Sequence, residues 1–170
     1  DATTFLRGDN TFAGAGITEF DLFRLTADTS SGSNADITTN LERDDTYGGL
    51  DKIGTGMTES SGVFTFPSTG KYEVFVNARM RFTAQDQNAR IDILVSTDGG
   101  STYNASAFVT QGTVTGGNAY MNASNLKVLN VTNTANIKVK FATVSFDAGN
   151  FLTGSTNVNY TTFKFTKLGD

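Results

Sequence analysis

The sequence lacks cysteine, histidine and tryptophan entirely, and it contains a single proline among 170 residues. Without cysteine, disulfides and thiolate metal sites are excluded, so stability must come from packing or from association between chains. Without histidine, the Ser-His-Asp triad, the Cys-His dyad and the usual zinc and iron ligand sets are excluded as well. An enzyme would have to use carboxylates, lysine, tyrosine or serine alone. The sequence nominates no catalytic residue, metal site or cofactor, and we predict a protein that is not an enzyme.

The chain also has no excess of basic residues and no long apolar run. The 13 Lys and Arg residues are outnumbered by 17 Asp and Glu residues, which gives a net charge of −4 and a pI of about 4.7. A nucleic-acid partner is not expected, because phosphate binding needs a basic field. Membrane insertion is not expected either, because no apolar segment approaches the ~18 residues of a membrane span. The chain shows no signal peptide and begins at Asp1 without Met, and we interpret it as a fragment or a processed product.

Strand patterns and turn residues dominate what is present. Gly, Ser, Thr and Asn are abundant and Phe occurs 14 times, a composition typical of all-β domains. Apolar and polar residues alternate most regularly over 71–82, KYEVFVNARMRF, which predicts a strand with one buried face. Rougher or shorter alternation predicts strands within 17–27, 89–96, 119–132, 136–146 and 159–169, with turn signals between them. We therefore predict a sandwich, jelly roll or barrel over residues 17–170, with an arm or linker over 1–16 and short edge strands in the polar stretch 28–62.

Phe75 departs from the alternation of the 71–82 strand, because it lies on the otherwise polar face. A single exposed aromatic residue is ordinary in a soluble protein. A phenylalanine on the outer face of a central strand is also what a subunit interface needs. We predict that Phe75 lies at such an interface.

Two acidic motifs have local explanations. The segment STDGGSTY at 96–103 resembles the Asp-box hairpin of sialidases and many other β proteins, in which Asp98 would accept backbone N–H bonds across the turn. We interpret it as a structural hairpin rather than a glycosidase centre. Asp44 and Asp45, with Asp51 nearby, could offer oxygen ligands to Ca²⁺. A solvated acidic loop is the favoured interpretation of that segment.

The order of the motifs resembles a known superfamily. SGVFTFPSTGKYEVFVNARM at 61–80 resembles the G-x-F-x-F-P-x-x-G-x-Y segment of the C1q/TNF-like jelly-roll superfamily. TTFKFTKLG at 161–169 resembles the aromatic final strand of the same superfamily. With the strands between them, the resemblance covers residues 17–170 and implies an all-β, C1q/TNF-like jelly-roll sandwich.

A closer likeness is to structural fibre proteins of tailed, particularly marine, bacteriophages. TTFLRGDNTFA at 3–13 and GGLDKIGTGMTESSGVFTFPSTG at 48–70 resemble the C-terminal part of such fibres, where an FLRGD-type segment marks the passage from a stem to a distal β domain. That family is usually trimeric, and the resemblance implies that Phe75 and Asn77, and with less support Tyr120, face a threefold axis. The RGD tripeptide at 7–9 then belongs to a solvated linker and is not an adhesion motif.

The resemblance implies a virion protein: the distal domain of a tail or head fibre on the particle surface. Its expected partners are two further copies of the chain, other virion proteins and a bacterial surface glycan. Tyr47, Tyr103 and Tyr120 could stack on sugar faces, although nothing in the sequence selects among them. Three alternatives stay open: a purely structural decoration or trimerisation domain, a cellular C1q-like secreted lectin that could depend on Ca²⁺, and a depolymerase with a carboxylate pair in a groove.

Overall fold

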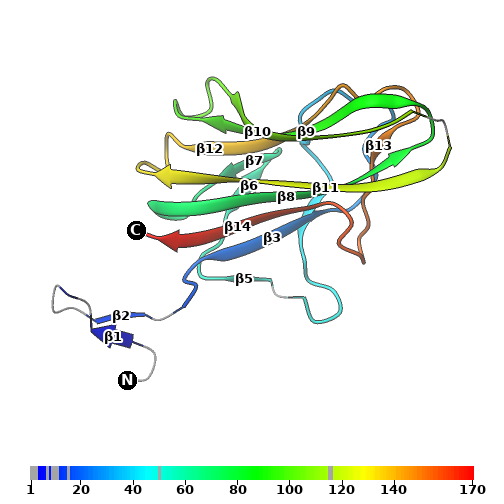
Figure 1. Cartoon of the computed structure of the whole chain (residues 1–170). Coiled ribbons are helices and arrows are strands. Elements are labelled where there is room, and N and C mark those ends of the chain that lie inside the picture. Colours follow the sequence, from blue (N-terminus) through cyan, green and yellow to red (C-terminus); the bar gives the residue numbers. More distant parts are fainter. Residues whose placement is uncertain (1–3, 7, 9–11, 15, 50, 115–116) are drawn as a thin grey trace.

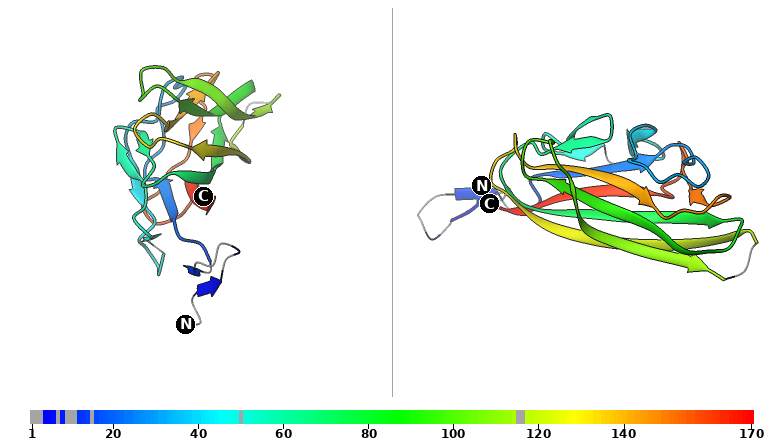
Figure 2. Two further views of the ribbon diagram at one scale, coloured as in Figure 1. Left: turned by 90° about the vertical axis from the view of Figure 1, so that its left-hand side faces the viewer. Right: turned by 90° about the horizontal axis from the view of Figure 1, so that it is seen from above.

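The computed structural model describes residues 4–6, 8, 12–14, 16–49, 51–114 and 117–170, and this part of the chain forms strands and loops without a helix (Figure 1). Two antiparallel sheets stack as the layers of a sandwich, which Figure 2 shows from the end and from above. The all-β prediction is therefore confirmed. Since these residues form no helix, the described chain offers no helical segment long and apolar enough to cross a bilayer.

The larger sheet has seven strands and the smaller sheet has five. In the larger sheet the strand order is β11 (Ala119–Val131), β8 (Gly70–Phe82), β14 (Thr162–Gly169), β3 (Phe20–Leu25) and β4 (Leu41–Arg43), with β13 (Phe151–Leu152) beside β8 and β5 (Lys52–Ile53) beside β3. In the smaller sheet the order is β10 (Asn104–Thr113), β9 (Asp86–Ser96), β12 (Lys138–Val144), β7 (Val63–Thr65) and β6 (Thr58–Ser60).

The core lies between the two sheets and is rich in phenylalanine. On β8 every second side chain from Tyr72 to Phe82 is buried, as the period-2 pattern predicts for a strand with one face on a core. The ring centroids of Phe64 in the smaller sheet and Phe165 in the larger sheet are 4.9 Å apart. Those of Phe141 in the smaller sheet and Phe163 in the larger sheet are 4.4 Å apart. Such ring pairs join the layers and add stability beyond the area that they bury.

The predicted strands are largely confirmed. Strands occur within each of the predicted ranges, and the polar stretch 28–62 contains only short strands, β4, β5 and β6 (Thr58–Ser60). The alternation did not predict β10, which pairs with β9 with register irregularities between Ala105 and Ala107 and between Gln111 and Thr113. An irregular register breaks the period of two, so the pattern of β10 is hidden in the sequence.

The sandwich is closed along one side, where β10 and β11 lie next to each other. The Asn125 side-chain amide donates a hydrogen bond to the Phe108 carbonyl oxygen, and the Gln111 amide donates one of 3.4 Å to the Asn122 carbonyl oxygen. These contacts link the edge strand of one sheet to that of the other. Edge strands held in this way are protected from pairing with other chains.

The sandwich has two different ends. β3 begins and β14 finishes at one end, because Phe20 pairs with Thr166 near the last residues of the chain. β8 finishes at the opposite end, where the loops that follow β8, β10 and β12 lie, and we call this the loop end (Figure 2). The chain therefore enters and leaves the sandwich at one end, which also holds the β9–β10 hairpin, and the loops after β8, β10 and β12 lie at the other.

The first residues form a separate two-stranded sheet. β1 (Thr4–Leu6) pairs with β2 (Phe12–Gly14), and neither strand pairs with the sandwich. Gly8 lies in the turn between them and is exposed. The Arg and Asp of the RGD tripeptide lie outside the described residues. The division into an arm over 1–16 and a domain over 17–170 stays a prediction.

Candidate functional site on the outer face of the larger sheet

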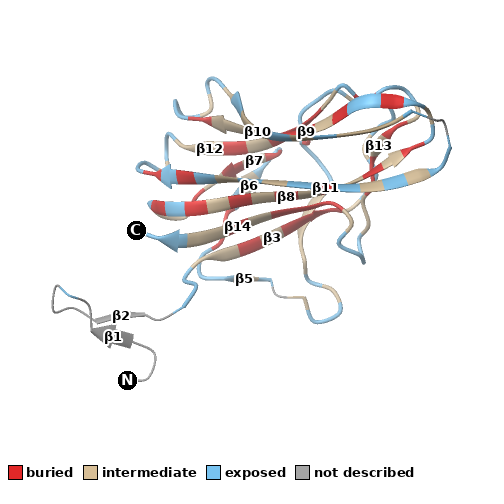
Figure 3. Cartoon of the chain, in the orientation of Figure 1, coloured by how far each residue is buried: buried red, intermediate tan, exposed pale blue. Residues whose placement is uncertain are grey.

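The outer face of the larger sheet carries apolar side chains that remain partly exposed. Leu126 and Val128 on the edge strand β11 are 46% and 48% exposed, and Figure 3 shows exposed residues along this strand beside the alternating pattern of β8. Across β3, β14, β8 and β11 the register places side by side one row of Leu22, Lys164, Phe75 and Leu126 and a second row of Phe20, Thr166, Glu73 and Val128. We call these two rows the apolar half of the face.

The outer face of the smaller sheet carries ion pairs and one exposed phenylalanine. Arg90 forms an ion pair with Asp92 at 2.6 Å, and Lys140 forms one with Asp36 at 2.6 Å. Phe108 is 52% exposed there, but the Arg90 guanidinium lies 4.7 Å from its ring centroid. The larger sheet has such features too, because Lys164 forms an ion pair of 2.8 Å with Glu73 and its amine lies 5.0 Å from the Phe75 ring centroid. It differs in the two neighbouring exposed side chains, Leu126 and Val128, on its edge strand. An apolar patch suits contact with another surface, so the larger sheet is the better candidate for an interface.

The three residues that the sequence nominated for an interface all lie on this outer face. Phe75 is half-buried in the first row, with the Lys164 amine 5.0 Å from its ring centroid. Asn77 follows two residues later on the same strand, and Tyr120 on β11 pairs with Arg81 nearer the loop end. The structure thus brings these residues to one face. Their contact with a second chain stays a prediction.

Toward the loop end the same face becomes cationic and aromatic. The Arg79 guanidinium contacts two rings, 4.4 Å from the centroid of Tyr120 and 4.3 Å from that of Tyr160. The neighbouring Arg81 lies 5.7 Å from Tyr120 and 5.5 Å from the Phe151 ring. Each contact at these distances is an attraction between a cation and a π face. We call this group the arginine–tyrosine cluster.

A shallow pocket of about 290 Å³ opens beside the cluster and is lined by Asn77, Arg79, Tyr120, Asn122, Asn159 and Tyr160. Asn77 donates a hydrogen bond of 3.0 Å from its amide to the Tyr160 carbonyl oxygen, which ties the segment before β14 to β8. Asn159 donates one of 2.7 Å from its amide to Asp44. The pocket walls are therefore fixed by one hydrogen bond between two lining residues and by another to Asp44 outside the pocket.

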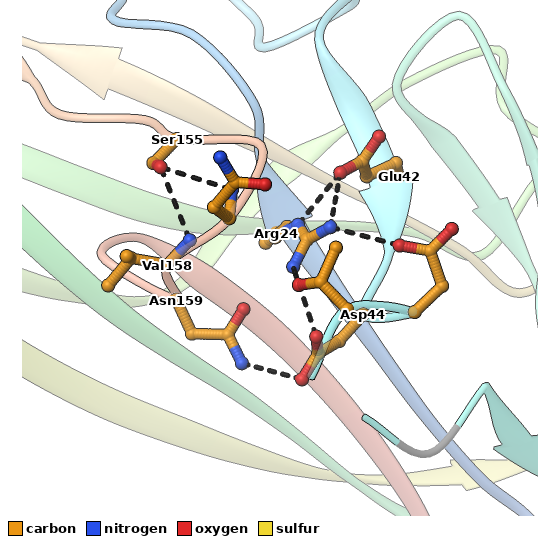
Figure 4. A network of polar contacts seen from close by, with 9 residues as sticks. Arg24, Glu42, Asp44, Ser155, Val158 and Asn159 are labelled. Carbon is orange, nitrogen blue, oxygen red and sulfur yellow. Dashed lines mark hydrogen bonds and ion pairs between the residues drawn. The ribbon is translucent and has the colours of Figure 1, made fainter. Parts of the chain in front are cut away.

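Asp44 belongs to a network around the buried side chain of Arg24 (Figure 4). Arg24 is 1% exposed although it points away from the core, because the segment that follows β4 covers it. Its guanidinium contacts the carboxylates of Glu42, Asp44 and Asp45, the last two at 3.0 Å each. Asp44 and Asp45, considered above as Ca²⁺ ligands or as a solvated loop, are thus the anionic partners of an arginine.

The Asp-box hairpin prediction is confirmed between β9 and β10. One oxygen of Asp98 accepts a hydrogen bond of 2.9 Å from the Thr102 backbone N–H, and the other accepts one of 2.6 Å from the Thr102 hydroxyl. Gly99 and Gly100 supply the positive φ angles of the turn. Because these hydrogen bonds favour the charged form, they lower the pKa of Asp98 well below its usual range.

The other tyrosines considered for sugar stacking lie apart from the cluster. Tyr47 is 90% exposed in the loop after β4. Tyr103 lies at the start of β10, which is the end of the sandwich opposite to Tyr120, and the Lys140 amine is 4.1 Å from its ring centroid. Tyr120 is thus the one of these three tyrosines that lies in the arginine–tyrosine cluster, together with Tyr160, which the sequence analysis did not nominate; a role in sugar stacking stays a prediction.

A second, larger recess lies at the loop end. It has a volume of about 650 Å³ and is lined by Asn34, Gln85, Asp86, Gln87, Asn88, Ser145, Phe146 and Asp147. Asp86 is buried and accepts hydrogen bonds of 3.0 Å from the backbone N–H of Asp147 and from the Asn150 amide. This carboxylate therefore ties the first residue of β9 to the loop between β12 and β13. The lining is mainly amide and hydroxyl groups, which suit hydrogen bonding to a polar ligand.

The described residues contain no group of three or more His, Cys, Asp or Glu side chains that could hold a metal ion. The buried carboxylates Asp21, Asp86 and Asp92 each have a structural partner: Arg43 for the first, loop N–H groups for the second and Arg90 for the third. These three carboxylates therefore make contacts that hold the fold together.

Comparison with known proteins identifies the fold. Eiger TNF from S. frugiperda matches with a TM-score of 0.60 and 11% identity, over 91% of this chain and 95% of that one. Murine APRIL matches with a TM-score of 0.54 and 14% identity, over 88% of this chain and 98% of that one. No protein-family model and no curated protein sequence matches the chain. The predicted TNF/C1q-like jelly roll is thus confirmed as a fold.

Proposed function

We propose that this chain is a homotrimeric, non-enzymatic display module, and specifically the distal domain of a tailed-phage fibre that attaches to a bacterial surface glycan. The observation that supports a trimer is the apolar half of the outer face, where Phe75, Leu126 and Val128 form a continuous partly exposed surface. Such a surface is stabilised when a second copy removes it from water. The phage assignment rests on the two sequence segments that resemble fibre proteins.

The two ends of the sandwich support the display role. The strand that begins the sandwich and the strand that finishes it lie at one end, and the polar recess between the loops lies at the other. A stem joined at the first end would leave the loop end facing outward. Three such ends on one assembly would bind a repetitive surface with higher avidity than any single site.

The attachment experiment compares the wild-type protein with a variant that disrupts assembly. Fluorescently labelled wild type is applied to bacteria of several hosts, and binding is measured on the strain that retains it. The variant Phe75→Glu is expected to bind 10²–10⁴-fold more weakly, because it loses the avidity of three sites. The matched control Phe108→Glu, which changes a half-exposed phenylalanine on the other sheet, is expected to bind as the wild type does.

Two results would count against the proposal. Equal binding by the wild type and a monomeric Phe75→Glu variant would contradict multivalent display. Retention of the trimeric wild type by none of the strains would contradict attachment and favour the purely structural alternative.

A further inference from the structure

Arg79 and Arg81 stand out among the arginines because neither has a carboxylate partner in the part of the chain that the structure describes. Of the five arginines that the structure describes, the other three, Arg24, Arg43 and Arg90, each form an ion pair with at least one Asp or Glu. Arg81 donates a hydrogen bond to the Asn118 side-chain oxygen. The guanidinium of Arg79 makes neither an ion pair nor a hydrogen bond to another described residue. The chain has a net charge of −4, so two arginines on one face without a carboxylate partner among the described residues are unusual.

The surroundings of Arg79 hold its guanidinium in place. The rings of Tyr120 and Tyr160 both contact the guanidinium, at 4.4 and 4.3 Å from their centroids, and its N–H groups donate no hydrogen bond to another described residue. The position of Tyr160 is fixed in turn by the bond from the Asn77 amide to its carbonyl oxygen. A cation that is already oriented loses little freedom when it binds an anion, so the usual entropic cost of ordering a long side chain is reduced.

The pocket beside Arg79 offers the second half of a recognition site. Its volume of about 290 Å³ is at the small end of the range for ligand pockets and suits a single sugar residue. Asn122 and Asn159 project amide groups from β11 and from the segment before β14. Asn159 uses its N–H to bind Asp44, so its amide oxygen remains to accept a hydrogen bond from a ligand.

We propose that the arginine–tyrosine cluster binds an acidic saccharide, with the carboxylate of one sugar residue on the N–H edge of Arg79 and the sugar hydroxyls on Asn122 and Asn159. A guanidinium edge donates two parallel hydrogen bonds to a carboxylate, which makes this pair both strong and selective. The inference rests on the proposed function, because it names the class of glycan that the module would recognise. It requires that copies associate through the apolar half, which leaves Asn77 and Tyr120 open to a ligand instead of facing the threefold axis as the sequence resemblance implies. Arg81, beside Tyr120, adds positive charge to the approach.

The experiment measures binding of glucuronate, with glucose as the neutral counterpart, by ¹⁵N NMR titration of the whole chain. Glucuronate is expected to shift the Arg79 Nε–H signal and the backbone signals of β8 and β11 near Tyr120, and glucose is expected to shift neither. The variant Arg79→Gln should weaken glucuronate binding roughly tenfold or more. Arg79→Lys keeps the charge without the planar edge and should also weaken it. Lys71→Gln on the same strand and face serves as the matched control and should bind as the wild type does.

Several outcomes would overturn the inference. Equal shifts with glucose and glucuronate, or unchanged binding by Arg79→Gln, would show that the guanidinium does not recognise the carboxylate. If the wild type is a trimer and the Arg79→Gln variant is a monomer, Arg79 pairs with a carboxylate of a second copy rather than with a ligand. The proposed function fails separately, because the solution mass is measured on the same samples without ligand. A trimer that ignores glucuronate defeats only the inference, and a monomer that binds glucuronate defeats only the assembly.

Discussion

Phe75 on β8 and Leu126 on β11 lie directly opposite each other in the larger sheet, and both side chains point away from the core. Side chains opposite each other on neighbouring antiparallel strands are in contact. The pair therefore forms one apolar unit in the middle of an outer face. Because 46% of Leu126 is exposed, this unit can be buried further only by another molecule.

The variant Phe75→Glu is expected to dissociate the assembly. The new carboxylate would lie at the centre of the apolar half beside Lys164, which already forms an ion pair with Glu73. Burial of this excess negative charge between copies is expected to weaken association about 100-fold or more. Sedimentation velocity checks the change in mass, and circular dichroism checks that the sandwich remains folded. Phe108→Glu should leave the mass unchanged, and dissociation by that control instead would place the interface on the smaller sheet.

Replacement of Arg24 tests the buried polar network. In Arg24→Met the carboxylates of Glu42, Asp44 and Asp45 lose their shared cation and repel one another. Because these carboxylates are partly exposed, we expect a loss of about 2–3 kcal/mol in the free energy of unfolding rather than the full cost of a buried unpaired charge. Urea unfolding measures it. The exposed Lys71→Met serves as control and should change that free energy by less than about 0.5 kcal/mol, and an equally small effect of Arg24→Met would contradict a stabilising role for the network.

The stability of the β9–β10 hairpin is expected to depend on pH through Asp98. Its pKa in the folded chain lies below the ordinary value of 3.8, so its contribution to stability is complete above that value and is lost as the pH falls toward the lowered pKa. An NMR titration of the Asp98 carboxyl carbon should therefore show a midpoint well below 3.8. In Thr102→Val the side-chain hydrogen bond is removed and the midpoint should rise. A midpoint that is ordinary in the wild type and unmoved in the variant would show that these hydrogen bonds do not form.

The sequence predicts those parts of the fold that depend on local pattern. The alternation of β8 is regular, so its two faces and the outward position of Phe75 can be assigned before the structure is known. The spacing of Ser96, Asp98 and Thr102 likewise predicts the hairpin, because every hydrogen bond in it joins residues a few positions apart.

The remaining features depend on segments that are distant in sequence. Arg24 reads as an outward-facing residue of β3, and only the loop after β4 buries it. Arg79 reads as an ordinary polar residue of β8, and nothing near it in the sequence places Tyr160 on one of its faces. The alternation of β8 predicts that Arg79 lies on the outer face. It does not predict that Arg79 has no carboxylate partner among the described residues, because ion pairing depends on tertiary structure.

The measurement that tests the central claim most directly is the solution mass of the purified chain by light scattering across a dilution series. A stable mass three times the 18.1 kDa of the chain is the predicted result, with the apolar half of the outer face buried between copies. A mass of 18.1 kDa at every concentration would contradict the interface role of Phe75 and the proposed trimer.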